Sequence, residues 1–500
     1  MLHYFSMKSK FFAGALALVL AELAFVHPLW AQTLQFPGLD PDPSASAFAR
    51  VRDYNWQDIG EIGLWASSVG VSGANTAAYA ELIRNSAADL LALPDLPIDL
   101  RERGEFVLTF IHQRFLKGGY VEHQTRLDEL FRTGRYNCVS SAVLYTVFAS
   151  AAGLDVRGVM TKDHAFITVH IGDELIDVET TNPMGFDPGN RREFHDGFGR
   201  LTGFAYVPAR NYRDRTAISQ IELVSLILTN RISELETRGR YNEAVPLALN
   251  RAALLKDRRD PVVSDFFSDP QKDLVDRLLN YGSSLMKSNQ EAAALQWAAL
   301  ASRQYPDPVR WQEFIYADMN NLLVRLLRGQ RIAEARDALE ANKELLSPEN
   351  LVKLDTLVVD AELVQLSARV KTAEEARDIL QIIEYALVRG SLTESRAREI
   401  RDFVILKEGE RLSSAGASRD AIEYTEAALA KYGRDPQLEG SIRVYRSNRV
   451  AELHNAFAAL FNAGDYEQAN RFIRAALEEF PRDRNLTQDL SLVERALKSR

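Results

Sequence analysis

The C-terminal part of the chain, from Ala217 onward, carries the pattern that most restricts the fold. Strand signals are absent there, and alanine-rich amphipathic helices fill the remaining sequence. An alanine pair spaced by seven residues, with a proline five residues later, occurs twice. The repeated residues are Ala294, Ala301 and Pro306, and then Ala469, Ala476 and Pro481. Because small residues let helices cross closely, the spacing predicts helix pairs that stack on one another.

The same region has a second repeated spacing of glycine, tyrosine and alanine, at steps of two and three. It occurs at Gly239, Tyr241 and Ala244, and again at Gly464, Tyr466 and Ala469. With these spacings the region resembles the tetratricopeptide repeat, a helix–turn–helix unit whose copies stack into a solenoid. About six copies are expected. The resemblance implies an all-α helical-repeat domain over residues 216–500 that binds a protein partner or the substrate. A helical domain without repeats is the alternative.

Residues 1–31 have the pattern of a secretory signal peptide. Two lysines precede the apolar run Phe11–Val26, and cleavage is expected after Ala31. A retained membrane anchor is the alternative, but the run is short and Glu22 interrupts it. No later stretch is apolar enough to span a bilayer. We therefore expect an exported protein, periplasmic or extracellular, with no integral membrane segment after the signal is removed.

Charge and cysteine content narrow the classes of function. The 500 residues carry a formal net charge of −9, which matches a nucleic-acid backbone poorly, so no nucleic-acid partner is expected. Cys138 is the only cysteine, so an internal disulfide is excluded. A free thiol in an oxidising compartment is open to oxidation unless it is buried or has a function. Cys138 is therefore the first candidate for a functional residue.

The segment between the signal peptide and the helical region combines helix and strand patterns. Residues 32–56 contain prolines, small residues and little periodicity, and are expected to form a linker. After the linker, the spacing of apolar residues predicts helices at 57–70, 76–92, 99–117 and 138–152. It also predicts strands at 156–160, 164–171 and 174–180, with a tight turn at Gly172-Asp173, and a short strand near Phe204 to Val207. We expect an α+β domain over residues 57–215, with a helix packed on a small antiparallel sheet.

Cys138 lies where one of these helices begins, directly after Asn137. The partial positive charge at a helix N-terminus stabilises a thiolate, and the N–H groups there can hold an oxyanion. Further along the chain, His164 opens a strand of the predicted sheet. A thiolate on a helix end beside a histidine on a sheet is the arrangement that nucleophilic catalysis requires. We therefore predict Cys138 as nucleophile and His164 as general base and acid.

An acidic residue is expected to orient the imidazole of His164. If the strands beside Gly172-Asp173 pair through a two-residue turn, Glu179 is the diagonal neighbour of His164. Asp177 then lies roughly 7 Å further along the strand. We predict Glu179 in this role, with Asp177 as the alternative if a looser turn or a bulge shifts the pairing.

The stretch from Tyr136 to Pro183 resembles the catalytic core of the transglutaminase-like superfamily, a papain-related group of cysteine enzymes. The matching positions are Cys138, Ala142, Leu144, Gly153 and Arg157, then His164 followed by Phe166, and finally Val178-Glu179-Thr180-Thr181. The chain departs from the family at Glu179, where Asp is commoner, and at Phe166, where Trp is frequent. The resemblance implies a papain-like α+β fold and action on amide or peptide bonds through a Cys–His–acid triad, by hydrolysis or acyl transfer.

Other roles for these residues remain open at this point. Cys138 would be inert if its thiol were buried in the core, as free cysteines often are. A zinc site of Cys138, His164 and His170 lacks any short ligand spacing, so neither a metal nor a cofactor is expected. Asn137 is expected to cap the helix, with assistance to the oxyanion as the alternative. Three further histidines are expected at the surface: His112, His123 and His195.

Together these features predict an exported cysteine peptidase, amidase or acyltransferase that acts on a protein or peptide, with helical repeats that bind the substrate or a partner. The alternative is a non-catalytic peptide-binding scaffold with a degenerate transglutaminase-like domain. The intact set of thiol, imidazole and acid favours the enzyme.

Overall fold

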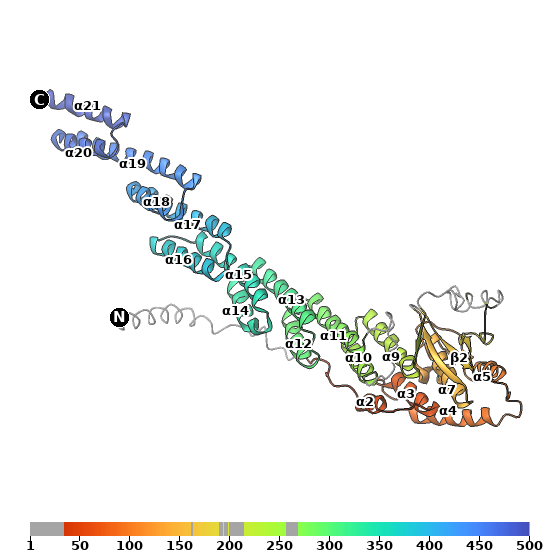
Figure 1. The fold of residues 1–500 in the computed structure, drawn as a ribbon. Helices are drawn as coiled ribbons and strands as arrows, with labels where there is room; N and C mark the ends of the chain where they lie inside the picture. The colour runs from red at the N-terminus through yellow and green to blue at the C-terminus, as the bar shows by residue number, and fades with distance from the viewer. Residues whose placement is uncertain are drawn as a thin grey trace. The chain divides into compact units, whose positions relative to one another are not determined.

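The computed structural model describes residues 35–161, 164–189, 194, 199, 215–256 and 269–499. Within them the chain is mostly helical, with one four-stranded antiparallel sheet and a helical C-terminal region (Figure 1). The chain divides into two compact units, which we call unit 1 (Met1–Phe314) and unit 2 (Ile315–Arg500). The expected signal peptide and the strand expected near Phe204 to Val207 lie outside the described residues.

Unit 1 holds the sheet and the helices on either side of it in the sequence. The helices before the sheet are α2 (Pro43–Ala49), α3 (Trp56–Ser68), α4 (Thr76–Leu91), α5 (Leu100–Arg114), α6 (Leu127–Thr133) and α7 (Cys138–Ala151). The strands are β1 (Asp155–Met160), β2 (Ala165–Ile171), β3 (Glu174–Val178) and β4 (Thr216–Ile218), in the spatial order β3-β2-β1-β4. The helices after the sheet are α9 (Gln220–Thr237), α10 (Tyr241–Leu254), α11 (Pro270–Lys287), α12 (Glu291–Gln304) and α13 (Pro308–Arg328), the last of which continues into unit 2.

The predicted hairpin forms with the expected pairing. Gly172 adopts a positive φ of 57°, which glycine tolerates, and Ile171 pairs with Glu174 across the turn. Three short elements of unit 1 were not predicted: α2, α6, and the edge strand β4, whose three residues pair with β1. A strand of three residues carries too little periodicity to be found in the sequence, because its pairing depends on a partner distant along the chain.

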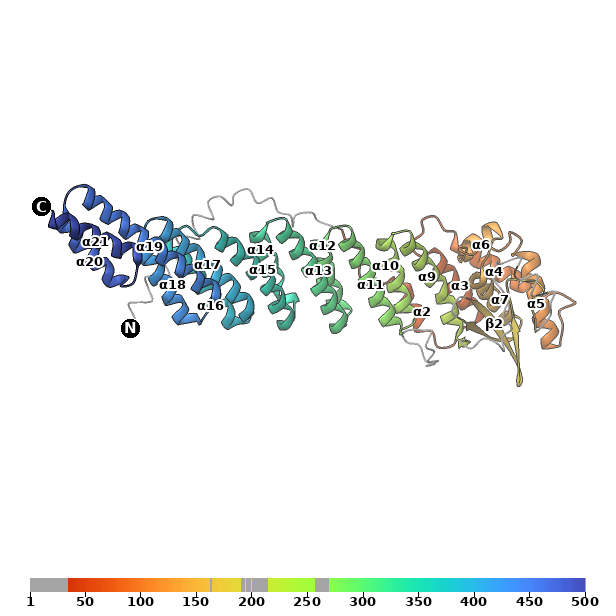
Figure 2. The same ribbon diagram turned by 90° about the horizontal axis from the view of Figure 1, so that it is seen from above.

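Helix α7 forms the core of the α+β part of unit 1. Every residue from Val139 to Ala149 is buried, and Val143, Tyr145 and Phe148 are fully so. It packs against β1 and β2 of the sheet and also against α3, α5 and α9 (Figure 2). The start of α7 is therefore held in a fixed position relative to the sheet.

Part of the segment expected to be a linker is ordered structure. Asp42 caps α2 by accepting a hydrogen bond from Ser44 N, and proline at the first helical position favours the helix start. Asp42 N in turn donates to Asn250 Oδ1 at 2.6 Å, so this segment is joined to α10. Phe36 packs against Trp297, with ring centroids 5.8 Å apart. The prolines thus define a helix start and an extended segment that lies against α10 and α12.

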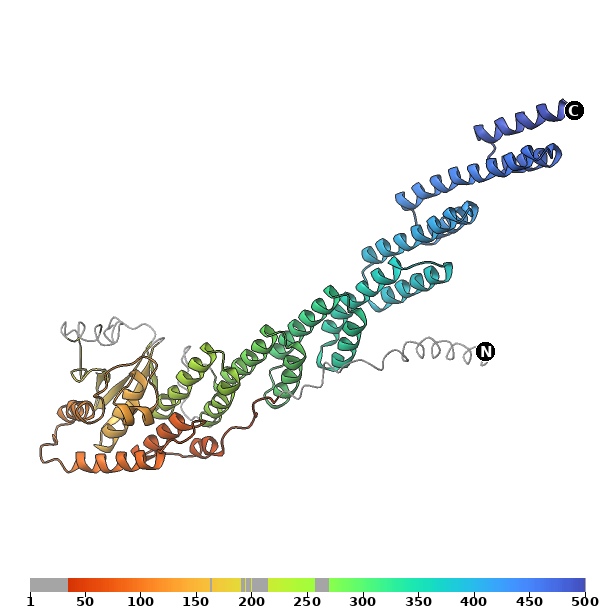
Figure 3. The same ribbon diagram turned by 180° about the vertical axis from the view of Figure 1, so that it is seen from behind.

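The regular elements in the described part of unit 2 are all helices, and from α14 onward successive helices pack against each other (Figure 3). After α13 these are α14 (Ile332–Asn342), the short η3 (Lys343–Leu345), α15 (Pro348–Ala368), α16 (Ala373–Arg389), α17 (Glu394–Ser414), α18 (Ser418–Tyr432), α19 (Pro436–Asn462), α20 (Tyr466–Glu479) and α21 (Arg484–Lys498). Ala469 and Ala476 are buried between helices, and Gly464 turns the chain with a positive φ of 78°. Among the described residues, no helix has both the length and the apolar character needed to cross a membrane.

Candidate active site

Asn137 makes α7 begin at Cys138. Its side-chain oxygen accepts a hydrogen bond from Ser140 N at 3.0 Å, and Asn137 N donates to Ser140 Oγ at 2.9 Å, so the two residues form a capping box. The Asn137 amide group also donates to the carbonyl oxygen of Glu122 at 2.9 Å. Both ends of this carboxamide are thus engaged: the oxygen caps α7 through Ser140 N, and the amide nitrogen holds the preceding loop.

The thiol of Cys138 lies beside the imidazole of His164. Cys138 is partly exposed, and its thiol is hydrogen-bonded to the His164 ring. The His164 side chain is 13 % exposed. Its backbone is fixed just before β2, where Thr161 N donates to the His164 carbonyl oxygen at 2.9 Å. The thiol is thus neither enclosed in the apolar core nor isolated from an imidazole.

Glu179, and not Asp177, holds the other side of the His164 ring. The distance from His164 Nε2 to Glu179 Oε2 is 2.6 Å, and Glu179 is 2 % exposed. The second carboxylate oxygen of Glu179 accepts hydrogen bonds from the N–H and the hydroxyl of Thr181. Asp177 accepts instead from Arg215 Nη1 at 2.8 Å and from the Thr168 hydroxyl at 3.0 Å. Because Nε2 is engaged by Glu179, the ring nitrogen left for the thiol is Nδ1.

The environment of His164 favours its charged form. Burial by itself would lower the pKa of His164, but the negative charge and hydrogen bond of Glu179, together with those of Cys138, hold the pKa well above its ordinary value of 6.5. An imidazolium that persists at neutral pH stabilises a neighbouring thiolate.

Three hydrogen bonds fasten the segment that carries Glu179, one to α5, one to α7 and one to the loop just before α7. His112 Nε2 donates to the Thr180 carbonyl oxygen at 3.0 Å, and the Tyr136 hydroxyl donates to the Thr181 carbonyl oxygen at 3.0 Å. The Ser141 and Thr180 hydroxyls are 2.8 Å apart. The surface position expected for His112 is wrong: the ring is largely buried, and burial lowers its pKa to about 4. His112 is therefore neutral at physiological pH.

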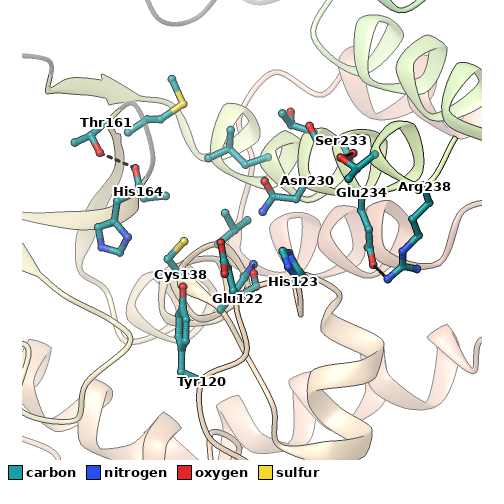
Figure 4. A pocket seen from close by; sticks show the side chains of 17 residues that line it. Tyr120, Glu122, His123, Cys138, Thr161, His164, Asn230, Ser233, Glu234 and Arg238 are labelled. Atoms are coloured by element: carbon teal, nitrogen blue, oxygen red, sulfur yellow. Dashed lines mark hydrogen bonds and ion pairs between the residues drawn. The ribbon is translucent and has the colours of Figure 1, made fainter. Parts of the chain in front are cut away.

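A cavity of about 450 Å³ opens in front of Cys138 and His164 (Figure 4). Tyr120 lines it and lies directly beside Cys138 in this view. Burial, and then the negative charges of Cys138, Glu122 and Glu179, raise the pKa of Tyr120, so its hydroxyl stays protonated. His123 lines the same cavity as an exposed residue, whereas His195 lies outside the described residues.

Sequence reasoning missed Tyr120, His112 and the cavity wall formed by α9. Tyr120 and His112 come from a loop and a helix whose distance from Cys138 carries no local pattern. Helix α9 begins at a recognisable capping box of Ser219 and Glu222, but only its packing against α7 places one face at the cavity.

The zinc alternative fails on geometry. His164 and His170 are six residues apart along extended backbone, which separates them by about 20 Å. Among the described residues, no group of three or more histidine, cysteine, aspartate or glutamate side chains is arranged to hold a metal ion.

Comparison with known proteins adds no assignment to this geometry. No protein-family model matches the sequence, and no curated protein matches it.

Proposed function

We propose that the chain is an exported, transglutaminase-like cysteine enzyme that acts on amide or peptide bonds by hydrolysis or acyl transfer. The observation that carries this proposal is a row of three groups: the Cys138 thiol at a capped helix start and the His164 imidazole, which both line the cavity, and behind them the buried Glu179 carboxylate. A helix that begins with the thiol and packs on an antiparallel sheet is also what a papain-like fold would contain.

The chemistry follows from the positions of these groups. The Cys138 thiolate attacks the carbonyl carbon, and the N–H groups of the first turn of α7 stabilise the resulting oxyanion. His164 gives its proton to the leaving nitrogen as the carbon–nitrogen bond breaks, which leaves a thioester on Cys138. His164 then accepts a proton from water or from an amine, which attacks the thioester and releases an acid or a new amide. Glu179 keeps the imidazole oriented and stabilises its charge.

The test is the rate at which iodoacetamide labels Cys138, measured by mass spectrometry at pH 6 and pH 8. At pH 6 an ordinary thiol is almost entirely protonated, so rapid labelling there requires a stabilised thiolate. We expect rapid labelling of the wild type at pH 6, and labelling at least about tenfold slower in His164→Ala. A wild type that is labelled only above pH 8 would favour the non-catalytic scaffold.

The helical region after the sheet is proposed to be a tetratricopeptide-like array. The buried alanines and the glycine turn that recur along it support this proposal. In the enzyme, such an array would bind a protein partner or part of the substrate.

A further inference from the structure

The cavity at Cys138 is bounded along one side by a single helix face. The lining residues from α9 and its C-cap are Leu226, Thr229, Asn230, Ser233, Glu234, Thr237 and Arg238. They recur at steps of three and four, so they lie on one face of the helix. At 1.5 Å per residue, this face is about 18 Å long. The loop with Tyr120, Glu122 and His123 lines the same cavity, so the cavity is a groove between this loop and α9.

The groove extends from Cys138 away from His164. In Figure 4, His164 and Thr161 lie on one side of Cys138, whereas Asn230, Ser233 and the Glu234–Arg238 ion pair lie on the other side. The leaving nitrogen must be next to His164, because His164 delivers the proton to it. The acyl part of the substrate must then extend in the opposite direction, along α9.

The side chains along the groove suit a peptide backbone. Leu226 is apolar and is at the end of this face nearest the start of α9, while Thr229, Asn230 and Ser233 are uncharged hydrogen-bonding residues. Such groups can pair with the repeating N–H and C=O groups of an extended chain. An extended chain advances about 3.3 Å per residue, so a groove of about 18 Å accommodates about five residues.

We propose that α9 binds the acyl side of an extended peptide substrate over about five residues, an inference that rests on the proposed function. The first helix after the sheet then sets most of the substrate specificity. A substrate is recognised by the length and the extended conformation of its acyl segment more than by any one side chain.

The experiment uses the full-length protein without its signal peptide and a series of acetylated alanine peptides of one to seven residues, each ending in a vinyl sulfone. The second-order rate of Cys138 labelling is expected to rise about 100-fold from one residue to about five residues and then to level off, since each added hydrogen bond contributes a few-fold. A rate that does not depend on length in the wild type overturns the inference.

Two matched substitutions test whether the dependence of the labelling rate on probe length arises in the groove. Ser233→Trp places a large ring in the groove, so its rate with the five-residue probe is expected to fall at least about tenfold, towards the rate with the shortest probe. Ser288→Trp makes the same change at the exposed end of α11, outside the groove, and is expected to behave as the wild type. Equal rates for the two variants would also overturn the inference.

Iodoacetamide at pH 6 separates this inference from the proposed function. If the wild type reacts with iodoacetamide but shows no dependence on probe length, the groove assignment alone is wrong. If the wild type does not react at pH 6, the proposed function itself is wrong.

Discussion

Glu179 supplies the carboxylate that lies against the His164 imidazole and favours its charged form. It is buried, it contacts His164 Nε2 at 2.6 Å, and its other oxygen is held by Thr181. A buried carboxylate with fixed partners can orient the imidazole and raise its pKa at the same time. Two methylene groups reach from the Glu179 backbone to the carboxylate that contacts the His164 ring.

Glu179→Gln tests this role, with Asp177→Asn as a matched control. The amide keeps the size of the side chain but removes its charge, so the pKa of His164 should fall and the imidazolium beside the Cys138 thiol should lose its proton at lower pH. We expect labelling by a peptidyl vinyl sulfone to slow by about 10²- to 10⁴-fold and its upper pH limit to move down. Asp177→Asn should keep the wild-type pH profile, because Asp177 contacts Arg215 and Thr168 instead. Equal profiles for the two variants would contradict the assignment.

His112 should make unit 1 sensitive to acid. Its pKa is about 4 in the folded protein, against 6.5 as the ordinary value, so between these pH values the unfolded chain binds more protons. The free energy of unfolding should therefore fall by about 3 kcal/mol between pH 7 and pH 4 on account of this group.

His112→Gln keeps an N–H donor for the Thr180 carbonyl oxygen but does not titrate. We expect this variant to lose less stability than the wild type over the same pH range. Urea unfolding followed by tryptophan fluorescence measures this, because all the tryptophans among the described residues (Trp56, Trp65, Trp297 and Trp311) lie in unit 1. The same pH dependence in both proteins would show that His112 is not the group responsible.

At the scale of elements, the site depends on the turn that follows β3. Glu179 N donates to the Gly185 carbonyl oxygen at 2.8 Å, and Gly185 N donates to the Asn182 carbonyl oxygen at 2.9 Å. A Cβ at position 185 would overlap the carbonyl oxygen of Glu179, so only glycine fits there. The turn thereby fixes the backbone from which Glu179 reaches His164.

Gly185→Ala should displace Glu179 without altering any group of the site. We expect labelling of Cys138 by the peptidyl vinyl sulfone to slow by at least about tenfold, because Glu179 would move by about 1 Å and no longer hold the His164 ring in place. Gly38→Ala is the control, since a Cβ at position 38 meets no atom within 4 Å. Wild-type reactivity in Gly185→Ala would show that the turn can adjust.

At the scale of the whole molecule, the start of the described chain is joined to helices more than two hundred residues later. Phe36 packs on Trp297, and the Tyr305 hydroxyl donates to the Leu39 carbonyl oxygen at 2.8 Å. Asp42 N donates to Asn250. All these contacts are within unit 1, so the N-terminal segment ties the helices after the sheet to those before it.

Phe36→Ala should lower the free energy of unfolding of unit 1 by about 2 kcal/mol, because a half-buried aromatic ring and its contact with Trp297 are lost. Urea unfolding followed by tryptophan fluorescence is the measurement. The exposed neighbour Gln35→Ala should leave the midpoint unchanged. If both variants unfold at the wild-type midpoint, the segment contributes nothing to stability.

The sequence by itself determined the pairing of the hairpin and most of the elements, although not the short α2, α6 and β4. Helix caps and periodicity are local, so the start of α7 at Cys138 followed from Asn137, and the turn at Gly172 set which strand residues pair. Because that pairing places Glu179 beside His164, the contact between them could also be predicted, although the catalytic roles of both remain predictions.

Only the tertiary structure decided what surrounds these residues. The burial of His112, the position of Tyr120 beside Cys138 and the α9 wall of the groove arise from packing between segments far apart in the sequence. No local pattern encodes such contacts, because they depend on how α5, α7 and α9 pack around the sheet. The N-terminal segment shows the same limit: its prolines predicted irregular chain, and its contacts with α10 and α12 made it ordered.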